Sequence, residues 1–205
     1  MVVADLLKKM TYEVVQGTID RTVSELVFDS RKACKDAVFV CISGAVVDGH
    51  TFVEEVVQKG VTTVIVKKEV TAPEGVTVVK VESTRLALAC MSAAYFGNPA
   101  EQLKTIGITG TKGKTTTSYM VKSILEKTGF KTGLIGTIET IIGDKHIPAV
   151  NTTPESYIVQ KTFREMVDAG IECVVMEVSS QGLMLHRVGG CLLYTSPSPR
   201  DISGS

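Results

Sequence analysis

Residues 108–117 read ITGTKGKTTT, a glycine-rich stretch between a predicted strand and a predicted helix. The strand is expected in LKTIGITG at 103–110. The helix is expected in SYMVKSILEKTG at 118–129, with one apolar stripe formed by Met120, Val121, Ile124 and Leu125. A strand, a glycine-rich loop and a helix in this order are typical of a phosphate-binding loop. The usual pattern has a glycine five positions before Gly113, whereas this sequence has Ile108 there.

The residue types in this loop suit a nucleotide phosphate. Gly110 and Gly113 let phosphate oxygens approach backbone N–H groups, and the N-terminus of the following helix adds a favourable field. We expect Lys114 to bind the β- and γ-phosphates and the Thr115 hydroxyl to bind Mg²⁺. Glu177 closes the apolar run CVVMEV, so it is expected at the carboxyl end of a neighbouring strand, where an acid can hold Mg²⁺ directly or through water.

The sequence before the loop predicts a small α/β domain. β-Branched apolar runs typical of strands alternate with a helical stretch, TFVEEVVQKG, that ends at Gly60. A second helix is expected at about 84–96, and it stops at the breaker cluster Gly97-Asn98-Pro99. We therefore place a domain boundary near residues 97–103.

The sequence after the loop continues the alternation of strands and helices. KTGLIGTIE is read as a strand, IIGDKHI as a hairpin around Gly143-Asp144, and IECVVMEVSS as a buried strand. Between them, PESYIVQKTFREMVDAG is read as a helix begun by Pro154, with Thr153 in the position of a cap. This order predicts a mostly parallel sheet covered by helices.

Composition excludes several classes of partner and compartment. Lysine plus arginine and aspartate plus glutamate both number 22, so charge gives no reason to expect nucleic acid or an anionic membrane. The five cysteines are scattered and are read as reduced thiols. The N-terminus lacks the apolar core of a signal peptide, and no run reaches membrane-spanning length, which predicts a soluble cytoplasmic protein.

The stretch after Gly190, CLLYTSPSPRDISGS, differs in kind from the rest of the chain. It is punctuated by serine, proline and glycine and has no helical or strand period. We interpret residues 191–205 as a non-native tail and exclude them from the predicted fold. A natural flexible C-terminus is the alternative.

Six short motifs, taken in order, resemble one family. FDSR, DGHTF, TGTKGKTTT, NTTP, EVSS and HRV are similar to the motifs of the Mur ligases of peptidoglycan synthesis, and the resemblance runs from about Asp5 to Gly190. In that family the loop has its glycine at the position of Gly110 and needs none at 108. Within the family, the pattern is most similar to members that add the third, diamino residue.

The resemblance implies a bacterial ATP-dependent amide ligase that is monomeric and needs Mg²⁺. Its substrates would be UDP-MurNAc-L-Ala-D-Glu, ATP and a diamino acid, either L-lysine or meso-diaminopimelate, joined through an acyl phosphate. Residues 1–98 would form the UDP-MurNAc-binding domain and residues 103–190 an incomplete central ATP-binding domain. The family's C-terminal amino-acid-binding domain is not in the sequence, so we expect the chain alone to be inactive.

The resemblance also assigns site residues. The ATP loop would be Gly110, Thr111, Lys112, Gly113, Lys114, Thr115 and Thr116, with Lys114 and Glu177 catalytic and with Thr115 and Glu177 binding the metal. Ser30 would contact the UDP-sugar. The muramoyl peptide would contact Asn151, Thr152, Thr153, Ser179 and Arg187. Gln181 and Leu185 depart from the family pattern, and neither is given a role.

Two other functions stay open from the sequence. One is the sister ligase that adds D-Ala-D-Ala to the UDP-MurNAc-tripeptide, which shares the phosphate loop; the NTTP motif speaks against it. The other is a nucleotide-binding module without ligase chemistry, in which the loop only changes conformation.

Overall fold

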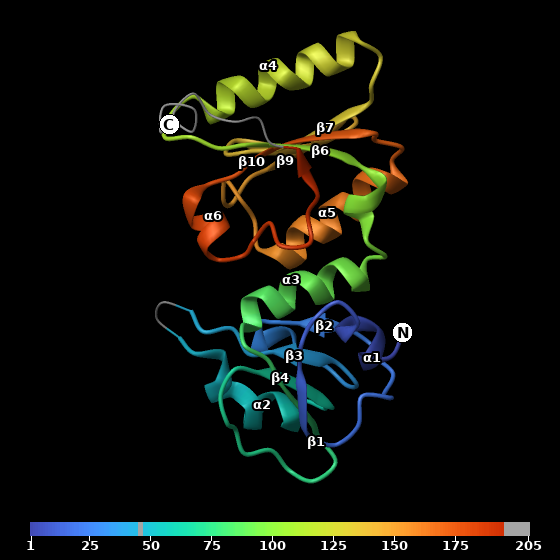
Figure 1. Cartoon of the computed structure of the whole chain (residues 1–205), viewed down its shortest axis with the longest axis vertical. Helices are drawn as coiled ribbons and strands as arrows, with labels where there is room; N and C mark the ends of the chain where they lie inside the picture. Colours follow the sequence, from blue (N-terminus) through green and yellow to red (C-terminus); the bar gives the residue numbers. More distant parts are fainter. Residues whose placement is uncertain (45–46, 195–205) are drawn as a thin grey trace, which may run out of the picture. The chain divides into compact units, whose positions relative to one another are not determined.

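The computed structural model describes residues 1–44 and 47–194. The chain divides into two compact units, the first from Met1 to Gly97 and the second from Asn98 onward. Each unit consists of a mostly parallel sheet with helices on both faces (Figure 1), which confirms the predicted α/β class.

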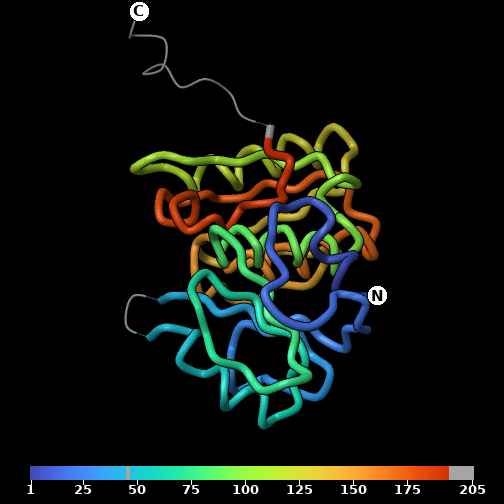
Figure 2. The backbone as a smooth tube through the Cα atoms, turned by 60° about the horizontal axis from the view of Figure 1, so that its bottom comes forward, coloured from blue at the N-terminus to red at the C-terminus, as the bar shows by residue number. Residues whose placement is uncertain are grey.

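The first unit is built on a five-stranded sheet with the order β1-β5-β4-β3-β2. Four strands run parallel, and β1 pairs antiparallel with β5. Their bounds are Glu13–Gln16 for β1, Leu26–Val27 for β2, Val38–Val40 for β3, Thr63–Val66 for β4 and Thr77–Lys80 for β5. Figure 2 traces the backbone of this unit in blue to green. The predicted apolar runs thus form the central strands.

Helices cover both faces of the first sheet. α2 (Val53–Gln58) follows the 3₁₀ helix η2 (Gly49–Phe52) and buries Val53 and Val56 in one core cluster with Phe39 and Val64. On the other face lies α3 (Thr84–Tyr95), which also contacts α1 (Val3–Leu7). A further 3₁₀ helix, η1 (Ser30–Lys32), follows β2.

The second unit is built on a six-stranded sheet with the order β11-β6-β10-β7-β8-β9. The strands β11, β6, β10 and β7 are parallel, whereas β8 and β9 form an antiparallel hairpin at one edge. Their bounds are Lys104–Ile108 for β6, Thr132–Ile135 for β7, Glu139–Ile142 for β8, Lys145–Pro148 for β9, Cys173–Glu177 for β10 and Leu193–Tyr194 for β11.

The second sheet is covered by α4 (Lys114–Lys127) on one face and by α5 (Ser156–Asp168) and α6 (Ser180–Met184) on the other (Figure 1). The short η3 (Pro99–Gln102) leads into β6. The sheet and α5 bury Phe163, Met166 and Val174 in one cluster. Every residue of β10 is buried, as predicted for a central parallel strand.

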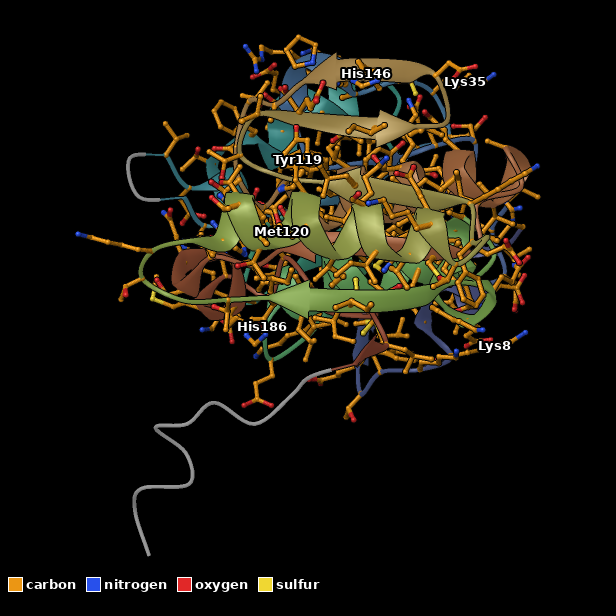
Figure 3. The ribbon with its side chains drawn as sticks, turned by 90° about the horizontal axis from the view of Figure 1, so that it is seen from above. Lys8, Lys35, Tyr119, Met120, His146 and His186 are labelled. Carbon is orange, nitrogen blue, oxygen red and sulfur yellow. The ribbon has the colours of Figure 1, made fainter. Side chains whose placement is uncertain are left out.

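The predicted apolar stripe of α4 is wrong in half of its residues. Val121 and Leu125 pack against Leu134, Ile141 and Val175, but the side chains of Met120 and Ile124 are 61% and 60% exposed. Figure 3 shows Met120 on the outward side of the helix. Of the two neighbouring apolar rows, the one formed by Val121 and Leu125 therefore faces the sheet.

Two predicted boundaries are also wrong. The run KTGLIGTIE is not one strand, because the chain turns at buried Gly136 and Glu139 begins the antiparallel β8. The helix predicted from Pro154 begins at Ser156, with the Glu155 side chain accepting a hydrogen bond from the Ser156 N–H. Thr153 is therefore not its cap.

The stretch after Gly190 belongs in part to the fold. Leu193–Tyr194 form β11, which pairs with β6, and Cys191 and Leu193 pack on the core. The exclusion of these residues from the fold was thus wrong, while residues 195–205 lie outside the described residues. All five cysteines are free thiols. None of the helices in the described ranges has the length and apolar character needed to cross a lipid bilayer.

Candidate phosphate-loop site and a second pocket

Three parallel strands of the second unit end at the same edge of the sheet. In the β6–β10 pairing, Glu177 lies opposite Ile108, and in the β10–β7 pairing Met176 lies opposite Ile135. The glycine-rich loop after β6, the carboxylate of Glu177 and the turn after β7 therefore meet. Ligands of open α/β sheets bind at this type of edge.

The glycine-rich loop joins β6 to α4 in a conformation that needs glycine. Gly110 has a φ of 149° and Gly113 a φ of 81°, and Gly113 is the residue that caps α4. The Lys114 ammonium lies over the loop and donates to the Gly110 carbonyl oxygen at 2.9 Å. The other predicted loop residues, Thr111, Lys112 and Thr116, are exposed. The lysine and the helix N-terminus thus border the same concave turn.

Glu177 is completely buried at this edge and accepts hydrogen bonds from uncharged groups. The hydroxyls of Thr115 and Thr137 lie 3.0 and 2.9 Å from Oε2, and the Thr137 N–H lies 3.1 Å from Oε1. Ser118 adds a longer contact of 3.4 Å to Oε1. The carboxylate and the Thr115 hydroxyl are therefore adjacent, as predicted.

The donor set fits a magnesium ion. The hydrogen-bond partners of Glu177 in the described residues carry no positive charge, and a buried ionised carboxylate without a cation is costly. Oxygen ligands from one carboxylate and one hydroxyl suit Mg²⁺, which takes its other ligands from water and phosphate. The described ranges contain no group of three His, Cys, Asp or Glu side chains able to hold a metal without such help.

A second polar cluster connects two predicted motifs, NTTP and EVSS. The buried Thr153 hydroxyl donates to the Glu177 carbonyl at 3.0 Å and accepts from the Ser179 N–H at 2.9 Å. Arg187 donates to the Thr153 carbonyl at 3.0 Å, and its Nε lies 3.7 Å from Glu155. These contacts fix both motifs against the end of β10.

The other residues predicted to bind the muramoyl peptide lie around this cluster. The hydroxyl oxygens of Thr152 and Thr137 lie 3.1 Å apart, which joins NTTP to the Glu177 network. Ser179 caps α6 by accepting from the Gly182 N–H at 3.0 Å. Asn151 is exposed at the start of the motif. The structure thus brings Thr152, Thr153, Ser179 and Arg187 to the sheet edge that carries Glu177.

Ser30 belongs to a separate pocket in the first unit. This pocket has a volume of about 590 Å³ and is lined by Phe28, Asp29, Ser30, Arg31, Phe39, Ile42, Gly44, Val47, Gly49, Phe52 and Glu55. Arg31 holds Asp29 with two bonds of 2.9 and 2.7 Å, and this contact lowers the pKa of Asp29 to about 2. The motifs FDSR and DGHTF thereby form two walls of one pocket of ligand size.

The sequence alone did not reveal Thr137 or Ser118 as partners of Glu177. It also did not reveal a chain of contacts beside them: the Tyr119 hydroxyl donates to Glu139 at 2.7 Å, and His146 lies 2.8 Å from the same carboxylate. Figure 3 shows Tyr119 between α4 and the hairpin that carries His146. Burial, aided by the bond to Glu139, raises the pKa of Tyr119 to about 12.

Two family models match the chain. The model described as "Mur ligase family, catalytic domain" matches residues 22–96, and "Mur ligase middle domain" matches residues 108–196. Among curated relatives, the UDP-N-acetylmuramoyl-L-alanyl-D-glutamate–2,6-diaminopimelate ligase of Clostridium perfringens is 52% identical over 93% of this chain and 39% of its own length. The ligase of the same name from Clostridium tetani is 44% identical over 93% of this chain. The chain spans about two fifths of the length of these relatives.

Solved structures show the same fold. A UDP-N-acetylmuramoyl-L-alanyl-D-glutamate–2,6-diaminopimelate ligase superposes with a TM-score of 0.77 at 21% identity, over 93% of this chain and 38% of that one. A UDP-N-acetylmuramoylalanyl-D-glutamyl-2,6-diaminopimelate–D-alanyl-D-alanyl ligase from Acinetobacter baumannii superposes with a TM-score of 0.59 at 27% identity, over 87% of this chain and 36% of that one.

Proposed function

The chain belongs to the Mur ligase family, and on this premise we propose that it is part of an ATP-dependent ligase that extends UDP-MurNAc-L-Ala-D-Glu by one diamino acid. The observation that carries the proposal is the meeting of the glycine-rich loop, Lys114 and the buried Glu177 at one sheet edge beside the NTTP and EVSS motifs. A nucleotide phosphate and a peptide carboxylate could meet there. The relatives are named for 2,6-diaminopimelate, so we propose this amine over lysine.

The reaction would proceed in two transfers. A carboxylate is a poor electrophile, because its leaving group would be oxide. In the first transfer the peptide carboxylate attacks the γ-phosphorus of ATP, the bond to the bridging oxygen breaks, and an acyl phosphate and ADP form. In the second, the amine attacks the acyl carbon, phosphate leaves, and the amine loses a proton.

The residues of the loop would position the phosphates and neutralise their charge. Lys114 is already held over the loop, where its ammonium can approach the β- and γ-phosphates. Thr115 and Glu177 would hold Mg²⁺, which supplies charge neutralisation on the phosphate oxygens. Thr111, Lys112 and Thr116, exposed on the loop and first helical turn, would border the nucleotide. Catalysis would rest mainly on this positioning.

The two polar motifs beside Glu177 would hold the muramoyl peptide. Arg187 can present its planar fork to a carboxylate or phosphate, and Glu155 and the Thr153 carbonyl orient it. Asn151, Thr152 and Ser179 offer neutral polar groups on the same side of the sheet. The Ser30 pocket in the first unit would take the UDP-sugar end.

The domain roles and setting are part of the proposal. The first unit would bind UDP-MurNAc and the second ATP, and both ligands are metabolites of the bacterial cytoplasm. The monomeric state and the inactivity of this chain on its own stay predictions.

Phosphate release by the full-length gene product tests the proposal. With UDP-MurNAc-L-Ala-D-Glu and ATP, we expect release that depends on 2,6-diaminopimelate, with lysine as a second arm. UDP-MurNAc-tripeptide with D-Ala-D-Ala tests the sister activity. Release only in that last arm, or in none, would overturn the assignment.

A further inference from the structure

The pocket of the first unit has two walls of different construction. One wall is the turn Phe28–Arg31, which follows β2 and continues into η1. The other is a segment after β3 that contributes Ile42, Gly49 and Phe52. Ser43 and Asp48 of this segment form an isolated antiparallel bridge with each other, which joins the wall to itself and not to β4.

Asp48 is the acceptor in several polar contacts of the second wall. Its Oδ1 accepts from the Ser43 hydroxyl at 3.1 Å and from the His50 N–H at 3.1 Å, and Lys68 forms an ion pair with Oδ2. The Gly49 N–H donates to the Ile42 carbonyl at 2.8 Å. The bonds from Ser43 to Asp48 and from Gly49 to Ile42 join the two ends of this segment to each other.

His50 connects this segment to the sheet. It is buried, its Nδ1 lies 2.6 Å from Asp48 Oδ1, and its Nε2 lies 3.0 Å from the backbone nitrogen of Lys67, just after β4. A backbone N–H can only donate, so Nε2 accepts and the proton of the neutral ring sits on Nδ1. The ring is thus a two-ended bridge, donating to the wall and accepting from the sheet.

We propose that His50 is a positioning residue for the UDP-sugar pocket. It does not line the pocket, but it holds Gly49 and Phe52, which do, at a fixed distance from β4. Without the bridge, the wall would occupy its binding-competent position in a smaller fraction of molecules, and the apparent Kd rises in inverse proportion to that fraction. The inference rests on the proposed function of this pocket.

Three substitutions of His50 distinguish an effect on ligand affinity from an effect on protein stability alone. His50→Phe fills the space and removes both bonds, His50→Asn can still donate to Asp48, and His50→Gln can still accept from Lys67. We expect His50→Phe to raise the Kd for UDP-MurNAc-L-Ala-D-Glu about tenfold, equal to about 1.4 kcal/mol. The Asn and Gln variants should fall between it and the unsubstituted chain. The Kd for MgATP, bound in the other unit, should not change.

The matched control is His146→Phe, which replaces an exposed histidine of the second unit and should leave the Kd for the UDP-sugar unchanged. Isothermal titration of all four variants, each with a thermal melt, decides the matter. Equal Kd values for the UDP-sugar in the three His50 variants and the unsubstituted chain would overturn the inference, even if their melting temperatures fall. If His50→Phe does not fold, the Asn and Gln variants carry the same test. An unsubstituted chain that binds MgATP but no UDP-sugar would instead overturn the proposed function of the pocket, and this inference with it.

Discussion

Asp48 in the first unit and Glu177 in the second are both acidic residues beside a candidate binding site, yet their surroundings are opposite. Asp48 is partly exposed and has Lys68 and His50 as partners within the protein, Lys68 first among the causes that lower its pKa. Glu177 is fully buried and is held by hydroxyls and one backbone N–H.

The difference distinguishes a carboxylate whose partners lie within its own loop and just after the neighbouring strand from one that we propose binds a metal ion. The charge of Asp48 is compensated internally, so its contacts hold the protein together. The charge of Glu177 lacks such compensation in the described residues, so a cation from outside would lower its free energy. The same functional group, a carboxylate, thus has a structural role in the first unit and a proposed role in binding in the second.

The largest effect should come from Glu177→Gln. The amide keeps the shape, and the neighbouring hydroxyls can reverse their bonds, but the negative charge that would attract Mg²⁺ is lost. We expect MgATP to bind at least about 100-fold more weakly, because even indirect partners of a metal have effects of about 10- to 100-fold and Glu177 would be a direct one. Titration calorimetry with and without Mg²⁺ measures it.

The same variant should not lose stability without metal, because it removes a buried charge that lacks a cation. Chemical unfolding in a chelator provides this control. If Glu177→Gln binds MgATP as tightly as the unsubstituted protein, or loses much stability without metal, then Glu177 has a structural role like that of Asp48. The contrast between the two carboxylates would then be wrong.

Lys114→Ala tests the loop itself. The variant loses a charge-assisted contact to phosphate, so ATP binding should weaken by about 1.5–3 kcal/mol. Stability should change little, because the hydrogen bond of the ammonium to the Gly110 carbonyl lies at an exposed position. Lys127→Ala, which removes an exposed lysine from the other end of α4, is the control. An ATP affinity that stays the same in Lys114→Ala would contradict the assigned role.

Asp48→Asn should act on stability instead. The amide oxygen can still accept from His50, but the charge that strengthens this bond is gone, so we expect a loss of about 1.5 kcal/mol in the free energy of unfolding. Since folding lowers the pKa of Asp48 from 3.8, its stabilisation is complete above that pH and is lost on acidification through the folded-state pKa. Denaturant titrations of both proteins at neutral and acidic pH measure the difference, which should shrink as the pH falls. A loss that is independent of pH would argue against the charge.

The parts of this contrast that sequence could predict are the local ones. The order of strand, loop and helix identified Gly113, Lys114 and Thr115, and the end of an apolar run identified Glu177. Those signals lie within a few residues of each other or at a strand end. The two-domain α/β fold followed from the same alternation of strand and helix.

The missed parts depend on contacts distant in sequence. Thr137 reaches Glu177 only because the chain turns at Gly136 at the end of β7, 40 residues before its partner. The inward face of α4 depends on how the helix rotates on the sheet, and a 3.6-residue period does not distinguish Val121 from Met120. The cap of α5 depended on whether Glu155 or Thr153 turned toward the helix, and Thr153 is bound to Ser179 instead.

The smallest predicted effect concerns the Tyr119–Glu139 contact, which lies next to the Glu177 site. Tyr119→Phe keeps the ring packed against the sheet but removes one hydrogen bond, which should cost about 1 kcal/mol of stability. MgATP affinity should stay unchanged, because Glu139 and not Glu177 accepts that bond. The control is Tyr12→Phe, which removes a tyrosine hydroxyl from the first unit.

The pH dependence gives this last prediction its sign. Folding raises the pKa of Tyr119 from 10.0 to about 12, mainly through burial. The neutral phenol is therefore favoured in the folded state, and its stabilisation is complete below pH 10 and lost as the pH rises toward 12. Tyrosinate absorbance should show a late-titrating tyrosine that is missing from Tyr119→Phe, and the stability difference between the two proteins should shrink in alkali. If MgATP affinity falls together with stability in Tyr119→Phe, the contacts of Tyr119 and His146 with Glu139 belong to the nucleotide site. That site then extends beyond Glu177 and its hydrogen-bond partners.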